Sequence, residues 1–497
     1  MAFAITQTCC ADASCVSVCP VNCIHPAPGE PDFGTTDLLY IDPATCIDCG
    51  ACADACPVDA IFPAGDLTGP LRAYEQINAE YYAGRDVLAG VSAAPNFHRW
   101  APPSFPRVLP SDFAPLDVAV VGTGPAGMYA VEDLLLHTNA RVTLVDRLPV
   151  AGGLIRYGVA PDHPSTKKIG ETFARFHDHP RLRLRLGVSA GPDLAGQHDA
   201  VIYAVGATDA RRLGVPGEDL PGSLPAATVV GWYNGHPDVG PDAVGLSADR
   251  VVVVGTGNVA LDIARILTAD PAALASTPIA PEALARLRSG KVREVVLLAR
   301  RGPETAAYTP PELLALASRG DLVVDTHDPR IAAAIDGAAA GEKAAWLRGV
   351  PREAVDWSSP PPDGRPRVVL RFHSAPVAFR GDPEVRAVLA SGPAGDVEIA
   401  AGRVVRAAGF RGAPVPGLPF DEETGTIPNT AGRVAGLPGA YVAGWIKRGP
   451  SGGIGANKAC ARETVGALLA DAVAGRLPGR PRRKGVGRAR NRAFGAT

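Results

Sequence analysis

The composition of the chain is that of an ordinary globular protein and excludes several classes. Its 497 residues are 46% hydrophobic and 20% charged, which fits about three domains with buried cores. The net charge of −2, from 49 basic and 51 acidic residues, favours no class of partner. No run approaches the ~18 apolar residues of a membrane span, and no basic and apolar leader is visible, so we expect a cytoplasmic protein without a membrane span.

Cysteine is concentrated in residues 1–66, which hold nine of the ten cysteines and no lysine or arginine. One run has the spacing C-x2-C-x2-C-x3-C-P, typical of bacterial iron–sulfur proteins. An earlier run fits the same template with an aspartate in its second position. Zinc sites use two C-x2-C pairs instead. The two runs are Cys46, Cys49, Cys52, Cys56, Pro57 and Cys9, Asp12, Cys15, Cys19, Pro20.

The paired runs resemble two-cluster bacterial ferredoxins, and the resemblance implies an α+β fold in which each run gives its fourth cysteine to the other cluster. Three thiolates suit a 3Fe–4S cluster, and a carboxylate is a harder, weaker ligand for a fourth iron. We therefore expect one 4Fe–4S cluster and one 3Fe–4S cluster, the latter convertible to 4Fe–4S with Asp12 as ligand. The implied ligand sets are Cys19, Cys46, Cys49, Cys52 and Cys9, Cys15, Cys56, with Asp12 in the fourth place of the second set.

Three cysteines are left over: Cys10, Cys23 and Cys460. We interpret them as small buried hydrophobic side chains, with Cys10 as an alternative ligand beside Cys9.

Residues 67–110 carry no motif. Apolar and aromatic side chains at helical spacing predict a helix over 72–90, interpreted as a docking helix. Six prolines between residues 93 and 115 predict a semi-rigid linker, with a domain boundary near Ser111.

A strand, a glycine-rich turn, a helix and a second strand are predicted in residues 117–146. Gly122, Gly124 and Gly127 have the G-x-G-x-x-G spacing of a dinucleotide site. The first makes the turn, the second admits a pyrophosphate, and the third lets helix and strand pack, while the helix N-terminus faces the phosphate charge. Asp146 ends the second strand, where a ribose hydroxyl needs an acceptor. Alone, this pattern indicates FAD or NAD.

A second fingerprint follows strand 251–254. Gly255 and Gly257 occupy the first two glycine positions, and Ala260 occupies the third, as the G-x-G-x-x-G/A pattern allows.

The second strand of this unit, 294–298, follows an insertion over 268–290 and ends differently from its counterpart. Arg300 and Arg301 stand where the first site has an acid. Two guanidinium groups bind a 2′-phosphate that a carboxylate would repel. The second site is therefore predicted to bind NADP.

A third glycine-rich stretch, GWIKRGPSGGIG over 444–455, lies between a strand at 440–443 and a helix expected from 456 to 469. Glycines before a helix place backbone N–H groups and a positive helix end against a ligand. Beside a reduced flavin, this helix end would stabilise negative charge.

The strings GGLIRYGVAPDH (152–163) and RRGP (300–303) resemble the adrenodoxin-reductase-like family of FAD-dependent ferredoxin–NADP reductases. The resemblance implies an α/β reductase with two dinucleotide-binding, Rossmann-type domains, FAD at the first fingerprint and NADP at the second. It implies that stretch 444–455 lies on the flavin ring and that Glu312 contacts the nucleotide. The implied catalytic residues are His163 and Asp262, a proton-handling pair, and Trp445, near the stacked nicotinamide.

The expected cofactor-binding residues fall into three groups. They are Gly122, Gly124, Pro125, Ala126, Gly127, Asp146, Arg147, Gly153 and Leu154; Gly255, Gly257, Asn258, Val259, Arg300, Arg301 and Glu312; and Gly444, Trp445, Gly453, Ile454 and Gly455.

We expect a multidomain chain. It comprises a ferredoxin domain (1–66), a helix and linker (67–110), a discontinuous FAD-binding domain (111–210 and 403–475), an NADP-binding domain (211–402) and a disordered basic tail (476–497).

The three expected electron carriers, nicotinamide, flavin and iron–sulfur cluster, together predict the function. A nicotinamide gives hydride, an iron–sulfur cluster takes single electrons, and a flavin does both. We expect an NADPH:ferredoxin oxidoreductase that passes electrons to its fused clusters, to an external ferredoxin or to a terminal enzyme such as a haem monooxygenase. We expect a monomer, and the basic tail lacks the interleaving of basic and aromatic residues that is typical of nucleic-acid binding.

Two alternatives stay open from sequence. One is the small, electron-input subunit of a glutamate-synthase-like oxidoreductase, which also pairs a cysteine-rich N-terminus with two glycine fingerprints. The other is a redox-sensing electron carrier without enzymatic activity, which the intact fingerprint glycines disfavour.

Overall fold

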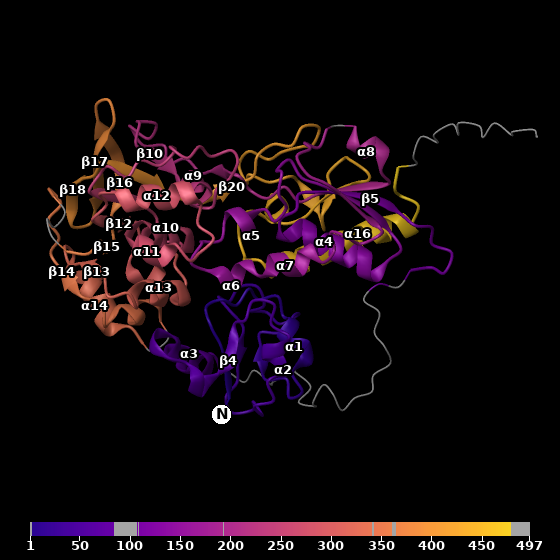
Figure 1. The fold of residues 1–497 in the computed structure, drawn as a ribbon, viewed down its shortest axis with the longest axis horizontal. Helices are drawn as coiled ribbons and strands as arrows, with labels where there is room; N and C mark the ends of the chain where they lie inside the picture. Colours follow the sequence, from indigo (N-terminus) through magenta and orange to yellow (C-terminus); the bar gives the residue numbers. More distant parts are fainter. Residues whose placement is uncertain are drawn as a thin grey trace, which may run out of the picture.

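The fold is that of a computed structural model. The structure describes residues 2–83, 107, 109–191, 193–339, 342–359 and 364–478. Most of the expected proline-rich linker and the tail beyond residue 478 lie outside these residues. Figure 1 shows a small N-terminal unit beneath the junction of two larger α/β units.

The N-terminal unit is built from two short antiparallel strand pairs, β1 with β4 and β2 with β3. Short helices α1 and α2 follow the two cysteine loops. The elements are β1 (Phe3–Ile5), α1 (Ser14–Val18), β2 (Ile24–His25), β3 (Tyr40–Ile41), α2 (Ala51–Asp54), β4 (Ile61–Pro63), η1 (Ala64–Asp66), η2 (Gly69–Arg72) and α3 (Ala73–Tyr82).

The two halves of this unit repeat at an offset of 37 residues, as Cys9 and Cys46 illustrate. Left-handed backbone recurs at the same offset, which is unusual for residues other than glycine. The two loops therefore wrap alike, as the two-cluster resemblance implies. The left-handed residues are Ala11, Ala13 and Asn22 in the first half and Asp48, Gly50 and Asp59 in the second.

Helix α3 belongs structurally to the N-terminal unit. The buried amide of Asn78 accepts hydrogen bonds from the N–H groups of Ile5 (3.1 Å) and Ile41 (2.8 Å) and donates to the carbonyls of Ile5 (2.9 Å) and Tyr74 (2.7 Å). The unit thus extends past the boundary predicted at residue 66. The expected helix over 72–90 is described as far as Tyr82, where α3 ends.

The first α/β unit has a seven-stranded sheet in the order β21-β22-β23-β8-β5-β6-β7, parallel from β23 to β7. Helices α4 and α16 pack on each other beside it. Its elements are β5 (Asp117–Val121), α4 (Pro125–His137), β6 (Arg141–Val145), α5 (Leu154–Tyr157), α6 (Pro164–Lys167), α7 (Ile169–Ala174), β7 (Leu182–Arg185), α8 (Leu194–Gln197), β8 (Ala200–Tyr203), β9 (Asp209–Ala210), β20 (Phe410–Arg411), β21 (Asn429–Thr430), β22 (Arg433–Val434), β23 (Ala440–Val442), α15 (Trp445–Arg448) and α16 (Ala456–Val473).

The second α/β unit has a parallel seven-stranded sheet in the order β10-β19-β11-β12-β15-β13-β14 and a separate antiparallel sheet β16-β17-β18. Its elements are β10 (Ser223–Pro225), α9 (Ala226–Tyr233), β11 (Arg250–Val254), α10 (Asn258–Thr268), α11 (Pro271–Leu274), α12 (Pro281–Ser289), β12 (Glu294–Leu298), η4 (Pro303–Thr305), α13 (Pro310–Ala317), β13 (Leu322–Asp325), α14 (Pro329–Gly337), η5 (Lys343–Leu347), β14 (Arg352–Glu353), β15 (Arg367–Arg371), β16 (Ala375–Gly381), β17 (Val385–Gly392), β18 (Gly395–Ala400) and β19 (Arg403–Arg406).

The chain enters and leaves the second unit through one antiparallel pair, β9 with β20. Strand β19 pairs with β10 and β11 in the second sheet, so this sheet reaches four residues past the boundary predicted at residue 402. In this position β19 pairs with the side of β11 that β12 leaves open, and it buries Val404 and Val405. The return to the first unit therefore falls between Arg406 and Phe410.

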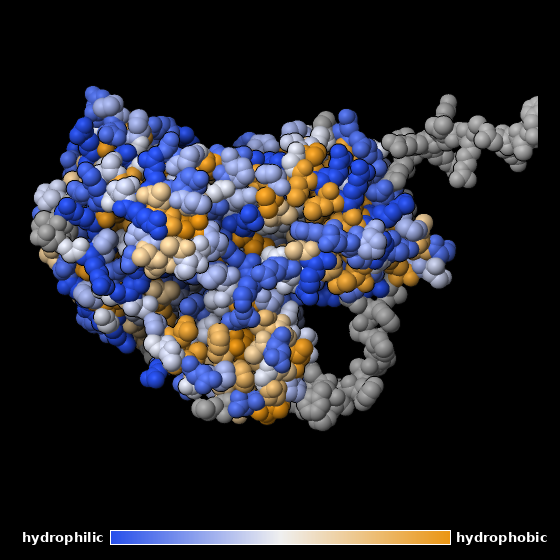
Figure 2. Space-filling model, in the orientation of Figure 1, coloured by the Kyte–Doolittle hydropathy of each residue, from blue (hydrophilic) through white to orange (hydrophobic). Residues whose placement is uncertain are grey.

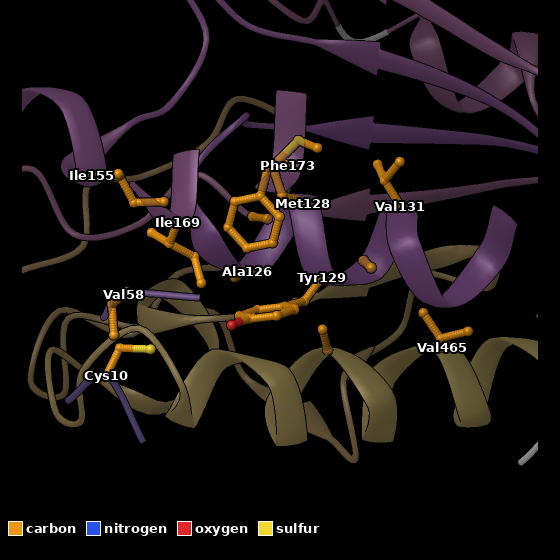
Figure 3. Close-up of a cluster of buried hydrophobic side chains, with 14 of the residues drawn as sticks. Cys10, Val58, Ala126, Met128, Tyr129, Val131, Ile155, Ile169, Phe173 and Val465 are labelled. Atoms are coloured by element: carbon orange, nitrogen blue, oxygen red, sulfur yellow. The ribbon is translucent and has the colours of Figure 1, made fainter. Parts of the chain in front are cut away.

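The N-terminal unit and the first α/β unit share one buried apolar core. Figure 3 shows Cys10 and Val58 of the N-terminal unit near Tyr129, Ile155 and Ile169 of the first α/β unit. In the part of the chain that the structure describes, no helix is both long and apolar enough to cross a membrane.

We predict that Asn78→Ala destabilises the N-terminal unit. The substitution leaves the buried N–H groups of Ile5 and Ile41 without a partner, at a cost of about 1–3 kcal/mol each. Thermal bleaching of the iron–sulfur absorbance should occur at lower temperature. Gln76→Ala, which removes an exposed contact with Glu80 on the same helix, is the control and should leave that temperature unchanged.

Candidate functional site

The cysteines gather into the two sets that the ferredoxin resemblance implies. Cys19, Cys46, Cys49 and Cys52 line one hollow, together with Cys23. At the other set, burial raises the pKa of the Cys15 thiol, and the neighbouring Cys9, Asp12 and Cys56 raise it further. We call these groups the Cys49 set and the Cys15 set.

Backbone N–H groups point at the sulfurs of both sets. The N–H groups of Ala11 and Ala60 donate to the sulfurs of Cys9 (3.4 Å) and Cys56 (3.3 Å), and that of Cys23 donates to Cys19 (3.4 Å). Such bonds stabilise thiolate ligands and tune a cluster's potential.

The sulfurs are spread too widely for a single metal ion. A tetrahedral zinc site with Zn–S distances of about 2.3 Å brings its sulfurs within roughly 4 Å of one another. Among the described residues, the single trio with ligand atoms within 4.8 Å of one another is His163, Asp262 and Glu312, and it contains no cysteine. The cysteine sets therefore fit clusters rather than mononuclear zinc.

The leftover cysteines are all buried, and the sulfurs of two of them contact site residues. The sulfur of Cys23 lies 3.4 Å from that of Cys19, so it touches the Cys49 set. The sulfur of Cys460 accepts a hydrogen bond from the N–H of Gly444 (3.2 Å).

Asp12 lies at the Cys15 set, and its carboxylate also approaches α16 of the first α/β unit. It accepts hydrogen bonds from the N–H and hydroxyl of Ser14 and lies 3.7 Å from the Nζ of Lys458. Its role as an iron ligand stays a prediction.

The first fingerprint has the close packing that its glycines require. A Cβ on Gly122 would lie 2.4 Å from the carbonyl oxygen of Ala204, and one on Gly127 would lie 1.9 Å from that of Gly122. Helix α4 begins directly after Gly124, with Pro125 in its first turn. The turn thus presents a helix N-terminus without side chains in front of it, which suits a pyrophosphate.

The carboxylate of Asp146 is buried and holds the glycine turn. It accepts hydrogen bonds from the N–H (2.8 Å) and hydroxyl (2.5 Å) of Thr123 and from the N–H of Leu148 (2.9 Å). The next residue, Arg147, forms an exposed ion pair with Asp238 of the second unit. The expected ribose contact of Asp146 stays a prediction, since the structure shows this side chain supporting the turn.

Three glycine stretches converge at this turn. A Cβ on Gly153 would lie 2.7 Å from the Cα of Gly124, and one on Gly444 would lie 2.6 Å from the Cβ of Ala126. Backbones approach this closely only at glycine. We call this meeting of glycine stretches at the start of α4 the first cradle, and it leaves backbone rather than side chains beside the helix end. Leu154 begins α5 and is 43% exposed.

Side-chain contacts within the third glycine-rich stretch, residues 444–455, fix its conformation. Trp445 donates from Nε1 to the carbonyls of Ser451 (3.1 Å) and Gly452 (3.2 Å), and its ring lies 6.1 Å from that of Phe410. Gly453 has open space where a Cβ would be, and Ile454 packs against the shared core. The nicotinamide role of Trp445 stays a prediction.

The second fingerprint is built like the first. A Cβ on Gly255 would lie 2.5 Å from the carbonyl oxygen of Ala407, whereas Gly257 faces open space at the start of α10. The Asn258 amide bonds both the N–H (2.9 Å) and hydroxyl (3.1 Å) of Thr309, which fixes the start of α13. Val259 packs against the core of this unit.

Arg300 and Arg301 follow the end of β12 and are exposed. Within the described ranges, neither guanidinium has a carboxylate partner. Both are thus available to an anion, as recognition of a 2′-phosphate requires.

The predicted pair His163 and Asp262 lies in a partly buried polar cluster at the junction of the two α/β units. Arg265 is its centre. The guanidinium donates to Asp162 (2.6 Å), Asp262 (2.6 Å) and Glu312 (3.1 Å) and lies 3.0 Å from Nε2 of His163. His163 and Glu312 approach to 4.0 Å. Because Arg265 supplies the positive charge, this trio of ligand-type side chains needs no metal ion.

Charge and burial shift the acids of this cluster in opposite directions. Burial and the neighbouring Asp262 raise the pKa of Glu312. For Asp162, burial opposes ionisation, but the Arg265 hydrogen bonds outweigh it and lower the pKa. The structure shows the carboxylate of Glu312 bonded to Arg265 (3.1 Å), and its expected contact with a nucleotide stays a prediction.

Sequence reasoning did not single out Arg265, Asp162 or Lys458. Arg265 lies three residues after Asp262, hence on the same helix face, and Asp162 precedes His163. The spacing of Asp262 and Arg265 could have indicated an ion pair on one helix. Their contacts with Asp162 and His163 become visible only in the structure, where the two α/β units meet.

The fold and the site define a two-nucleotide flavoprotein-type oxidoreductase joined to an iron–sulfur domain. The 4Fe–4S binding domain family matches residues 39–62, and the pyridine nucleotide-disulphide oxidoreductase family matches residues 116–302. Beyond residue 66 the chain has a single cysteine, Cys460, so the disulfide chemistry in the second family's description has no cysteine pair here.

Curated relatives cover nearly the whole chain. A probable ferredoxin/ferredoxin–NADP reductase of Mycobacterium tuberculosis is 46% identical over 96% of this chain and 85% of its own length. The human mitochondrial NADPH:adrenodoxin oxidoreductase is 37% identical over 76% of this chain and 84% of its own. The chain belongs to the ferredoxin–NADP reductase family.

Solved structures agree. Mycobacterium tuberculosis FprA in complex with NADPH is 39% identical and covers 74% of this chain and 88% of its own, with a TM-score of 0.66. The resemblance and the fold class expected from sequence are thereby confirmed.

We predict that Arg265→Gln destabilises the junction by about 3–5 kcal/mol at pH 7, because it removes the buried cation that three partly buried carboxylates share. The lowered pKa of Asp162 gives stability that is complete above the unfolded value of about 3.9 and is lost as pH falls through the native pKa. The deficit should therefore be full at neutral pH and shrink in acid, as urea unfolding across this pH range would show.

The matched control is Arg286→Gln, which removes an exposed ion pair with Asp242 and should cost less than about 1 kcal/mol. Equal deficits for the two variants would contradict the assignment of Arg265 as the centre of the cluster.

Proposed function

We propose that the protein is an NADPH:ferredoxin oxidoreductase that carries its own ferredoxin domain. The strongest support is that one chain combines two glycine-rich nucleotide sites with two cysteine sets. The first nucleotide site has an acid, Asp146, at its strand end, and the second has Arg300 and Arg301. Its family membership gives the same activity. NADPH is the hydride donor, and iron–sulfur centres receive the electrons.

The chemistry needs a converter between hydride and single electrons, and a bound FAD supplies it. The converging glycines at Gly124, Gly153 and Gly444 support FAD at the first cradle. The amino end of α16, beginning at Ala456 after Gly453 and Gly455, would place positive helix charge beside the flavin ring.

The second cradle is proposed to hold NADPH. Gly255 and Gly257 leave room for the pyrophosphate at the start of α10, and Arg300 and Arg301 are free for the 2′-phosphate. The proton-handling role of His163 and Asp262 is supported by their contact with Arg265, which holds both side chains at the junction between the cradles.

The cysteine sets are proposed to hold one 4Fe–4S and one 3Fe–4S cluster. The Cys49 set supplies four thiolates and the Cys15 set three, with Asp12 beside them. For the final acceptor we propose an external ferredoxin or a terminal one-electron enzyme such as a haem monooxygenase, and for the enzyme itself a monomer.

The two alternatives are less well supported. A small subunit of a glutamate-synthase-like enzyme would need a large partner, whereas relatives named as reductases match 96% of this chain. A carrier without enzymatic activity does not require Arg300 and Arg301, which are exposed and have no carboxylate partner in the described part of the chain.

We expect NADPH added anaerobically to bleach the flavin absorbance and then to produce the EPR signals of reduced clusters. Dithionite, which reduces clusters directly, is the control for cluster integrity. Clusters that dithionite reduces but NADPH leaves oxidised would show that the fused domain is not on the electron path.

We expect Arg300→Ser and Arg301→Ser each to raise the KM for NADPH by about 10–100-fold, the equivalent of one charged hydrogen bond of about 1.5–3 kcal/mol. The KM for NADH should change little, because NADH has no 2′-phosphate. Arg288→Ser, at an exposed arginine on α12, is the control. Equal losses for NADPH and NADH would contradict the 2′-phosphate contact.

A further inference from the structure

The N-terminal unit docks on the reductase through the loop of the Cys15 set. The N–H of Gly455 donates to the carbonyl oxygen of Cys10 (2.8 Å). A Cβ on Gly455 would lie 2.1 Å from the carbonyl oxygen of Ala11, so this approach requires glycine. The loop therefore lies directly against the residue that precedes α16.

Charge reinforces the same orientation. Lys458, in the first turn of α16, donates from Nζ to the carbonyl oxygen of Asp12 (3.2 Å) and lies 3.7 Å from its carboxylate. Lys168 forms an ion pair with Asp59 nearby. Because residues 1–66 contain no lysine or arginine, every lysine or arginine ion pair between the two parts must place the cation on the reductase.

Apolar packing completes the contact. Cys10 and Val58 share a buried core with Tyr129 and Ile155, and Figure 3 shows them facing the α4 and α7 region of the first unit. Burial of this kind holds a domain in one orientation rather than in a loose encounter.

The Cys49 set has a more open setting. Cys49 is an exposed side chain, and the neighbouring Ile47 is 55% exposed. Figure 2 shows apolar side chains on the end of the N-terminal unit that faces away from the reductase.

We propose that the two cysteine sets act in series, with the Cys15 set receiving electrons from the flavin site and the Cys49 set passing them to the external acceptor. This proposal rests on the proposed function. Electron tunnelling weakens steeply with distance, and Gly455 puts the Cys15 loop at the flavin cradle. NADPH yields NADP+, one proton and two electrons, which pass singly along the sets to two equivalents of a one-electron acceptor such as ferredoxin.

Carbodiimide cross-linking tests the orientation without using activity. The reagent joins amines and carboxylates that already touch, and the ion pair of Lys168 and Asp59 is half exposed. Mass spectrometry of the holoenzyme should find a Lys168–Asp59 cross-link that Lys168→Arg abolishes. Cross-links from Lys168 to Asp48 or Asp54, beside the Cys49 set, would overturn the proposal.

Two ligand variants test the order. In Cys15→Ser, freeze-quench EPR should show loss of NADPH-driven reduction of the Cys49 set, while dithionite still reduces it. In Cys49→Ser, NADPH should still reduce the Cys15 set, while transfer to external ferredoxin is lost. The reverse pattern would overturn the proposal.

Lys458→Glu keeps every cysteine and thus covers the case in which the ligand variants do not fold. The new carboxylate repels Asp12, so NADPH-driven cluster reduction should be lost, and Lys458→Arg should restore it. Wild-type cluster reduction in Lys458→Glu contradicts the proposal. Flavin that NADPH fails to bleach would instead show that the proposed function is wrong.

Discussion

One close backbone contact, between Gly455 and the Cys10–Ala11 loop, joins the ferredoxin domain to the reductase. It requires glycine on the reductase side and a left-handed residue, Ala11, on the other. The consequence is a fixed neighbour for the helix end that the FAD cradle is proposed to use. Ion pairs and apolar packing around it act in the same direction, so the ferredoxin domain is a seated part of the enzyme rather than a tethered one.

The reductase itself depends on a contrast of charge between two similar cradles. The first strand-end acid, Asp146, holds its glycine turn, whereas Arg300 and Arg301 have no carboxylate partner among the residues that the structure describes. Between the cradles, Arg265 gathers acids from both units, so the buried charge there is paired. The junction can therefore be buried and polar at once, which suits a place where hydride leaves one nucleotide for another.

Local features were predictable from sequence, and contacts between units were not. Strand 294–298 and the starts of α4 and α10 follow from apolar runs and glycine spacing, and the structure confirms them. The seating of Asn78, the pairing of β19 in the second sheet and the position of Arg265 depend on residues far apart in the chain. Periodicity does not encode such partners, so the unit boundaries near residues 66 and 402 were placed too early.

The most direct measurement is an anaerobic crystal structure of the cofactor-loaded protein, in which anomalous scattering locates the iron. The account predicts iron at the Cys15 set beside Gly453 and Gly455, with the flavin on the other side of these glycines and the Cys49 set farther out. Iron of the Cys49 set lying nearer the flavin, or an N-terminal unit detached from α16, would contradict it.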